Sequence, residues 1–225
     1  MTRGRCLVLV AAVCLLWASV PAPRADTVTL GPNDNDVRIL SGGANTNYHN
    51  QDFLSVYDNP GNVQHSLLQF DLSGIPANQT IAFATLTVYR DSQIWNGGDN
   101  GMPTNVYRVT TPWVNTDATW NQASSGVAWM NPGGDYVGTT GMQAMDPYAS
   151  NMLNINFPGS KGDMGEGGIF PLSFDVTALV NEWYNGVKPN NGLLLEAPTG
   201  NELHFRADRG ADPYIYPGLT ITFHP

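Results

Sequence analysis

The chain has 225 residues and a mass of 24.3 kDa, a size at which all-β proteins often form one domain. Charged residues make up 13% of it, against a usual ~25%, whereas Gly and Pro number 24 and 16. A coiled coil or helical bundle is excluded, because both need many Glu, Lys, Ala and Leu residues. Disorder is disfavoured, because 42% hydrophobic residues are enough to build a core.

The N-terminus has the pattern of a secretory signal peptide. Two arginines precede an apolar run from Cys6 to Val20, and small residues and prolines follow it. The run is too short for a membrane span, which needs ~20 residues. We expect residues 1–25 to be removed, with cleavage after Ala25 or alternatively after Ala22. The mature protein, residues 26–225, is then extracellular, with the periplasm or cell surface as open alternatives.

Cleavage changes the charge and the cysteine content. Both cysteines, Cys6 and Cys14, leave with the signal, so no disulfide stabilises the mature chain. Loss of three arginines leaves 7 basic against 19 acidic residues, a net charge of −12. A field of that sign disfavours nucleic acid, anionic membranes and anionic glycans that no cation bridges.

The mature chain contains many short β-type runs separated by turn residues, which predicts a sandwich or barrel. In one of them, apolar Ala82, Ala84, Leu86 and Val88 alternate with polar residues, as expected for an antiparallel strand with one buried face. In residues 66–72, Leu68, Phe70 and Leu72 likewise share one face, and Leu67, Gln69 and Asp71 are expected on the wetter one. The expected strands are 27–30, 37–40, 53–57, 63–72, 81–90, 105–109, 169–174, 192–197, 202–205 and 219–223.

One helix is expected over residues 176–184, where Val176, Leu179, Val180 and Trp183 share a face. Asp175 or Thr177 is expected to cap it. Residues 131–168 hold 9 glycines and little periodicity, so we expect a long loop insertion within a single domain.

Motifs for catalysis are scarce in this sequence. It has no zinc-protease motif, no nucleophile elbow and no P-loop. Glu196 and Glu202 flank a short turn and could approach each other across a hairpin as a glycosidase pair, which needs two carboxylates ~5–9.5 Å apart. Two solvated charges are the favoured interpretation.

Tryptophan is more informative, because flat aromatic faces stack on sugar rings while polar neighbours bind hydroxyl groups. Trp120, Trp129 and Trp183 are expected in the core. We expect the carbohydrate-binding platform to consist of Tyr89, on the wetter face of its strand, with Trp95 and Trp113.

Several segments together resemble the extracellular DNRLRE domain family, over roughly residues 27–223. They are 66–76, 84–89, Trp113 with 118–121, 174–180 with Trp183 and Gly186, and 190–196. The resemblance implies an all-β, antiparallel jelly-roll-like β-sandwich that is secreted and binds polysaccharide. The family motifs are mainly fold-forming positions, and we expect the domain to stand alone, without a catalytic module.

The sequence therefore predicts a secreted, non-catalytic domain whose partner is a polysaccharide or cell-surface glycan, with no nucleic acid and no membrane insertion. One alternative is a structural or adhesive surface protein that uses the same sandwich. The third class of function considered is a small polysaccharide-degrading enzyme that uses Glu196 and Glu202.

A structural calcium ion is also expected. Residues 33–36 are dense in the oxygen ligands that calcium prefers, and Asp34 and Asp36 would contribute carboxylates. Asp208 or Asp212 would add another if the terminal strands pair. The competing interpretation is a solvated Asn/Asp turn.

Overall fold

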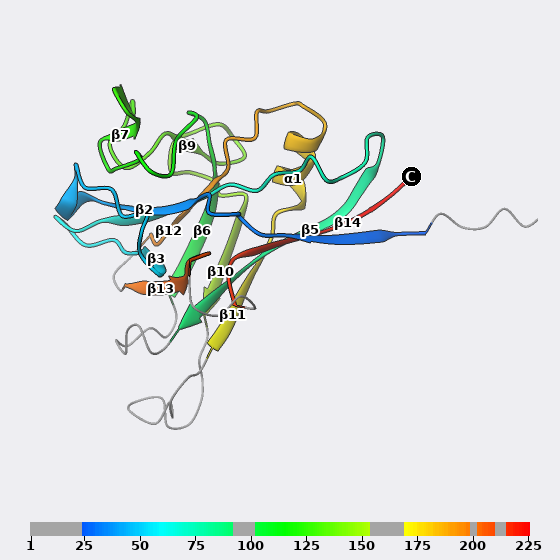
Figure 1. Cartoon of the computed structure of the whole chain (residues 1–225), viewed down its shortest axis with the longest axis horizontal. Coiled ribbons are helices and arrows are strands. Elements are labelled where there is room, and N and C mark those ends of the chain that lie inside the picture. The colour runs from blue at the N-terminus through cyan, green and yellow to red at the C-terminus, as the bar shows by residue number, and fades with distance from the viewer. Residues whose placement is uncertain (1–23, 92–101, 154–168, 199–201, 210–214) are drawn as a thin grey trace, which may run out of the picture.

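The computed structural model describes residues 24–91, 102–153, 169–198, 202–209 and 215–225. Within these residues the chain forms two six-stranded antiparallel sheets that face each other, with one α-helix at one end (Figure 1). Successive strands repeatedly change sheet, which is the connectivity of a jelly-roll-like sandwich. The predicted all-β fold is confirmed.

The first sheet, sheet A, has the order β1-β14-β5-β13-β3, and β11 also pairs with β5. Its strands are β1 (Asp26–Leu30), β3 (Phe53–Val56), β5 (Thr80–Asp91), β11 (Ile169–Asp175), β13 (Leu203–Arg206) and β14 (Gly218–His224). The N-terminal and C-terminal strands of the described chain therefore lie side by side, with Asp26 opposite Phe223.

The second sheet, sheet B, has the order β10-β6-β12-β4-β2, and β9 also pairs with β6. Its strands are β2 (Asp36–Leu40), β4 (Gln64–Leu68), β6 (Met102–Val109), β9 (Tyr136–Val137), β10 (Ala149–Leu153) and β12 (Leu193–Glu196). A separate hairpin pairs β7 (Gln122–Ser124) with β8 (Val127–Ala128).

The interior core lies between the two sheets and extends under the helix α1 (Thr177–Tyr184). The expected core residues Phe70, Leu86 and Leu179 are fully buried, and Trp183 is 6% exposed. The helix begins at Thr177, one residue after the predicted start, and Val176 occupies the N-cap position. The expected capping residue Asp175 accepts hydrogen bonds through Oδ1 from the backbone N–H of Thr177 (3.0 Å) and from its hydroxyl (2.6 Å). A short 3-10 turn covers Ser41–Gly43.

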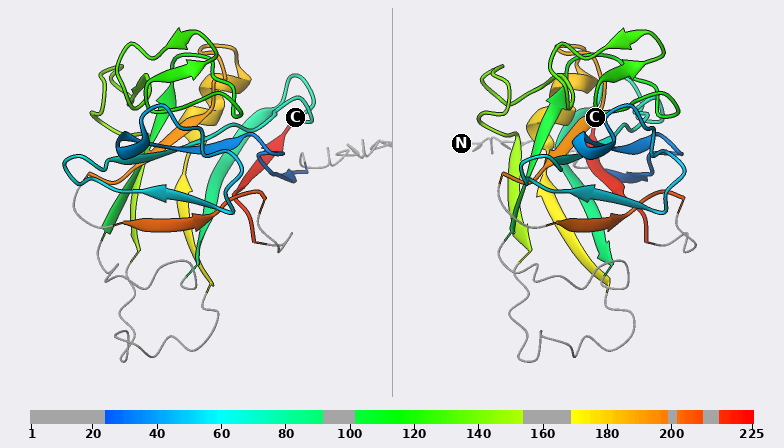
Figure 2. Two further views of the ribbon diagram at one scale, coloured as in Figure 1. Left: turned by 60° about the vertical axis from the view of Figure 1, so that its left-hand side comes forward. Right: turned by 90° about the vertical axis from the view of Figure 1, so that its left-hand side faces the viewer.

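A second, outer core lies on the opposite face of sheet B. The chain between residues 111 and 148, here called the covering segment, packs over that face, and Figure 2 shows it near the end of the sandwich where α1 lies. The outer core consists of Val37, Ile39, Leu67, Tyr107, Val109, Trp113, Ala118, Ala123, Trp129, Tyr136 and Leu194. Strands β2, β4, β6 and β12 of sheet B are therefore buried on both faces, whereas strand alternation predicts a wetter outer face for residues 66–72.

All ten expected strands are present, with ends that differ by a few residues. The strand expected at 63–72 is shorter than predicted, because it ends at Leu68. The expected irregular loop at 131–168 contains two strands, β9 and β10, and each of them pairs with β6. Strand β10 forms an edge of sheet B. No helix among the described residues has the length and apolar character needed to span a bilayer.

Candidate ligand-binding pocket

A pocket of about 350 Å³ lies at the outer face of sheet B, beside the covering segment. We call it the Trp120 pocket. Its lining combines three rings with carboxylate and amide groups, and the residues are Asp58, Val63, His65, Trp120, Pro132, Tyr136, Gln143, Glu196, Ala197 and Pro198.

Strand alternation directs two of these side chains outward from sheet B. In β12, Leu193 and Leu195 belong to the interior core and Leu194 to the outer core, so Glu196 lies on the outer face. In β4, His65 shares that face with Leu67, which also belongs to the outer core. Glu196 is only 9% exposed, although it is a carboxylate.

The covering segment supplies the rings Trp120 and Tyr136. The ring centroids of His65 and Trp120 are 5.1 Å apart, and those of His65 and Tyr136 are 5.5 Å apart with an edge-on geometry. Gly133 allows this arrangement, because its φ is +96° and a Cβ there would lie 2.7 Å from the Trp120 ring. Trp120 stays half-buried, so part of its indole borders the pocket.

Hydrogen bonds hold these groups in place. The Tyr136 hydroxyl donates to Glu196 Oε2 at 2.7 Å. His65 Nδ1 lies 2.8 Å from the carbonyl oxygen of Gly133, and it must donate there because a carbonyl oxygen only accepts. The backbone N–H of Tyr136 donates to Gln143 Oε1 at 3.2 Å.

Burial determines the charge of the pocket. It lowers the pKa of His65, so the imidazole is neutral at neutral pH. Burial, followed by the negative charge of Glu196, raises the pKa of Tyr136 and raises that of Tyr107 to about 12. Neither Lys nor Arg occurs among the described lining residues, so the carboxylates of Asp58 and Glu196 make the pocket anionic.

The expected aromatic platform is not assembled in this structure. Tyr89 is half-buried in sheet A, opposite Pro171 of β11, and Trp95 lies outside the described residues. Trp113 is 7% exposed and its indole N–H donates to the carbonyl of Asn191 at 2.8 Å. The assignment of Trp113 to an exposed platform is therefore wrong, because the ring is part of the outer core.

Trp120 is the residue that the sequence reasoning missed. It was expected in the core with Trp129, which is indeed 4% exposed. The signal that could have found it is the pair Gly133-Gly134, since adjacent glycines let a backbone approach an aromatic ring closely.

Glu196 and Glu202 do not face each other across a hairpin. The chain passes from β12 in sheet B to β13 in sheet A between them, and these two strands do not pair with each other. Glu202 instead accepts a hydrogen bond from Gln64 Nε2 at 2.8 Å and pairs with His204 Nε2 at 2.8 Å. The hairpin on which the glycosidase alternative depended is absent from the described strands.

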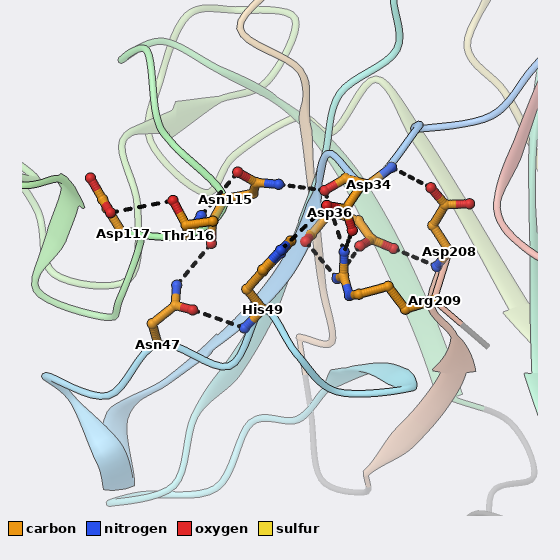
Figure 3. A network of polar contacts seen from close by, with 9 residues as sticks. All are labelled: Asp34, Asp36, Asn47, His49, Asn115, Thr116, Asp117, Asp208 and Arg209. Atoms are coloured by element: carbon orange, nitrogen blue, oxygen red, sulfur yellow. Dashed lines mark hydrogen bonds and ion pairs between the residues drawn. The ribbon is translucent and has the colours of Figure 1, made fainter.

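The acidic residues near the N-terminus form a network with the loop after β13 (Figure 3). Asp36 is fully buried, and it accepts a hydrogen bond from the backbone N–H of Asp208 at 2.8 Å. Arg209 reaches between Asp34 and Asp36 and forms ion pairs with both carboxylates. Burial raises the pKa of Asp36, while Asp208 N–H and Arg209 oppose that rise.

Three of the four expected calcium ligands, Asp34, Asp36 and Asp208, therefore lie together, and Asp212 is outside the described residues. In this arrangement Arg209 supplies the positive charge. Among the described residues no group of three or more His, Cys, Asp or Glu side chains is placed to hold a metal ion. Calcium binding stays a prediction, and Arg209 would compete with the ion for the carboxylates of Asp34 and Asp36.

The fold and the pocket define an antiparallel β-sandwich domain with a ligand-sized site on one sheet face. Residues 34–221 match the disaggregatase related repeat domain, and the chain belongs to that family. A search among curated proteins found no match. The family description names a repeat domain and identifies no catalytic residue in this chain.

This match corrects the assignment to the DNRLRE family, which is wrong. The segments that carried the resemblance contain Phe70, Leu86, Leu179 and Trp183, all of which are core residues. Such positions specify a sandwich core and do not distinguish one sandwich family from another. The polysaccharide binding implied by that resemblance loses its support, so any ligand must be argued from the pocket.

Proposed function

We propose that the protein is a secreted, non-catalytic polysaccharide-binding domain and that a sugar unit occupies the Trp120 pocket. The observation that carries the proposal is the half-buried Trp120 ring beside the carboxylate of Glu196 in one pocket. Secretion rests on the signal-peptide pattern of residues 1–25, of which 1–23 lie outside the described residues.

The chemistry of the lining matches that of a sugar. An indole presents a flat apolar face on which the C–H groups of a pyranose ring stack, as aromatic residues do in many ligand sites. Glu196, Asp58 and Gln143 supply oxygen acceptors for hydroxyl donors around that face. A volume of about 350 Å³ is at the lower end for small-molecule sites, so one or two sugar units of a longer chain would fit.

Electrostatics narrows the glycan class. The mature chain has a net charge of −12. The described lining of the pocket includes two of its carboxylates and no Lys or Arg. Uronic acid or sulfated polymers would be repelled from such a site. The proposal therefore favours glycans without anionic groups.

A binding role for Glu196 follows from its contacts. Its Oε2 accepts a hydrogen bond from the Tyr136 hydroxyl, and Glu202, its expected catalytic partner, directly precedes β13 of the other sheet. With that pairing gone, we assign no reaction to the protein.

Affinity electrophoresis of the mature protein through gels that contain neutral, amino or anionic polysaccharides tests the proposal. Retardation by a non-anionic polymer supports it, and unchanged mobility in every gel contradicts it. Removing the Trp120 ring must reduce the retardation if the site is the Trp120 pocket.

A structural or adhesive role is the second candidate, and one surface favours it. Phe83 is 68% exposed on the outer face of sheet A, among threonines that pair across β1 and β14, with Thr27 to Thr222 at 3.1 Å and Thr29 to Thr220 at 2.9 Å. Sedimentation analysis separates the two roles. Self-association that Phe83→Ser abolishes would favour the structural role, and a monomer retarded by glycan would favour binding.

A further inference from the structure

The carboxylate of Glu196 is buried without a cationic partner in the described lining of its pocket. Its hydrogen-bonding partners are neutral groups, the hydroxyl of Tyr136 at 2.7 Å and the hydroxyl of Tyr107, and it is 9% exposed. Removing an ionised carboxylate from water is costly unless a positive charge compensates it. A ligand that carries such a charge would relieve this cost on binding.

The other titratable groups around Glu196 do not supply that charge. From the strands of sheet B, His65 and Tyr107 face it, and burial keeps the first neutral and the second protonated. From the covering segment come Tyr136, which is also protonated, and the carboxylate of Asp146, whose negative charge acts on Tyr107. Asp58 at the exposed rim adds a further negative charge.

The positive charge must therefore come from outside the pocket. We infer that the Trp120 pocket recognises a protonated sugar amine, as in a polymer of hexosamine units whose amino groups carry no acetyl group. The ammonium group donates to Glu196 and Asp58, and the sugar ring lies against Trp120. An aromatic face also attracts a cation directly, so the ring and the carboxylates favour the same ligand. The inference rests on the proposed function and names its substrate class.

The same geometry discriminates against related sugars. An N-acetylated amine has no positive charge, so it leaves the buried carboxylate uncompensated. A neutral hexose offers only hydroxyl donors, which form weaker hydrogen bonds to a carboxylate than an ammonium does. The selectivity then depends on one substituent of the sugar.

Isothermal titration of the mature protein with three β-1,4-linked oligosaccharides of equal length provides the test. The three probes are oligomers of glucosamine, of N-acetylglucosamine and of glucose. Below the pKa of the sugar amine we expect the glucosamine oligomer to bind roughly ten- to a hundredfold more tightly than the other two, the range that a hydrogen bond to a charged group provides. Above that pKa the preference should disappear.

The preference should depend on Glu196 itself. Glu196→Gln keeps the shape and the oxygen that accepts from Tyr136, and it should bring the affinities for the three oligomers close to one another. Glu182→Gln is the matched control, because Glu182 also accepts a tyrosine hydroxyl at 2.7 Å, from Tyr148, and does not line the pocket. Asp58→Asn, at an exposed position, provides a second variant if the Glu196 variant does not fold.

The outcomes separate the inference from the function on which it rests. Equal affinity for the glucosamine and N-acetylglucosamine oligomers, with both weakened by Trp120→Ala, overturns the amine preference and leaves the glycan site standing. No binding of any of the three oligomers overturns the inference, and the proposed function falls with it only if no polysaccharide in the affinity gels retards the protein. An amine preference that Glu182→Gln reduces as much as Glu196→Gln does would also overturn the inference.

Discussion

The hydroxyl of Tyr136 donates a 2.7 Å hydrogen bond to the carboxylate of Glu196. The two residues lie 60 positions apart, and the bond joins the covering segment to strand β12 of sheet B. It also supplies the buried carboxylate with a donor, without neutralising its charge. The outer core and the Trp120 pocket therefore share this contact, because Tyr136 belongs to the outer core and both residues line the pocket.

The first prediction is that Tyr136→Phe lowers stability. The substitution keeps the ring but removes the donor, so a buried acceptor keeps only the Tyr107 hydroxyl, which costs about 1–3 kcal/mol. Urea denaturation at neutral pH measures the difference. Tyr148→Phe is the matched control, because Tyr148 donates at the same distance to Glu182, which is 30% exposed and can bond water instead. Equal losses in the two variants would contradict the special role of Glu196.

The second prediction concerns the aromatic residue that binds glycan. Trp120→Ala should weaken binding of the glycan identified in the affinity gels by about 1–2 kcal/mol, the range of aromatic and cation–π contacts. Tyr89→Ala should leave that affinity unchanged, because Tyr89 belongs to sheet A. Titration calorimetry gives both values. If Tyr89→Ala weakened binding and Trp120→Ala did not, the glycan would bind at the aromatic platform expected from the sequence.

The fold was predictable because its signals are local. Alternation of Leu86 and Val88 with Thr87 is visible within a few residues, and the structure buries the two apolar side chains. Leu67 shows where this fails. Alternation assigns it to the wetter face, but the covering segment, which begins more than forty residues later, packs over it and leaves Leu67 fully buried.

The site was less predictable because it depends on long-range contacts. Trp113 is held in the core by the carbonyl of Asn191, 78 residues away, and Trp120 is positioned by Gly133. The residues next to each tryptophan in the sequence do not show that Trp113 is buried and that Trp120 borders a pocket. Likewise, the short interval from Glu196 to Glu202 suggests a hairpin, and only the sandwich topology shows that the chain changes sheet there.

The third prediction is an acid-sensitive contribution to stability from His65. Burial lowers its folded-state pKa below the usual 6.5, so the unfolded chain binds the proton more readily. The contribution is then fully present above pH 6.5 and is lost as pH falls through the folded-state pKa. Urea midpoints over a series of pH values should fall more steeply in the wild type than in His65→Asn, whose amide can still donate to Gly133.

Other groups also titrate in acid. The test is therefore the difference between the wild type and His65→Asn in how steeply the urea midpoint falls with pH. Asp175 and Asp71 have lowered pKa values because of hydrogen bonds from Thr177 and Ser73, and they contribute equally to both proteins. Parallel curves for the wild type and His65→Asn would show that the buried imidazole is not the source.

The fourth prediction concerns the interior core. Phe70 follows β4, is fully buried and belongs to the interior core, so Phe70→Ala should cost about 3–5 kcal/mol from lost burial and the cavity left behind. Chemical denaturation measures the loss. Phe83→Ala is the control, because that ring is 68% exposed. A midpoint as high for Phe70→Ala as for Phe83→Ala would contradict the assigned packing.

The last prediction concerns calcium and Arg209. If Asp34, Asp36 and Asp208 hold a calcium ion, the ion stabilises the folded chain by mass action, by about 2.7 kcal/mol at a hundred times its dissociation constant. The melting temperature should then be higher in millimolar calcium than in EDTA, and Asp34→Asn should remove the difference. Arg209 competes for the same carboxylates, so Arg209→Gln should lower stability in EDTA and enlarge the calcium effect. Identical melting temperatures in calcium and EDTA, for both the wild type and Arg209→Gln, would leave Arg209 as the counter-ion of the network and exclude the metal.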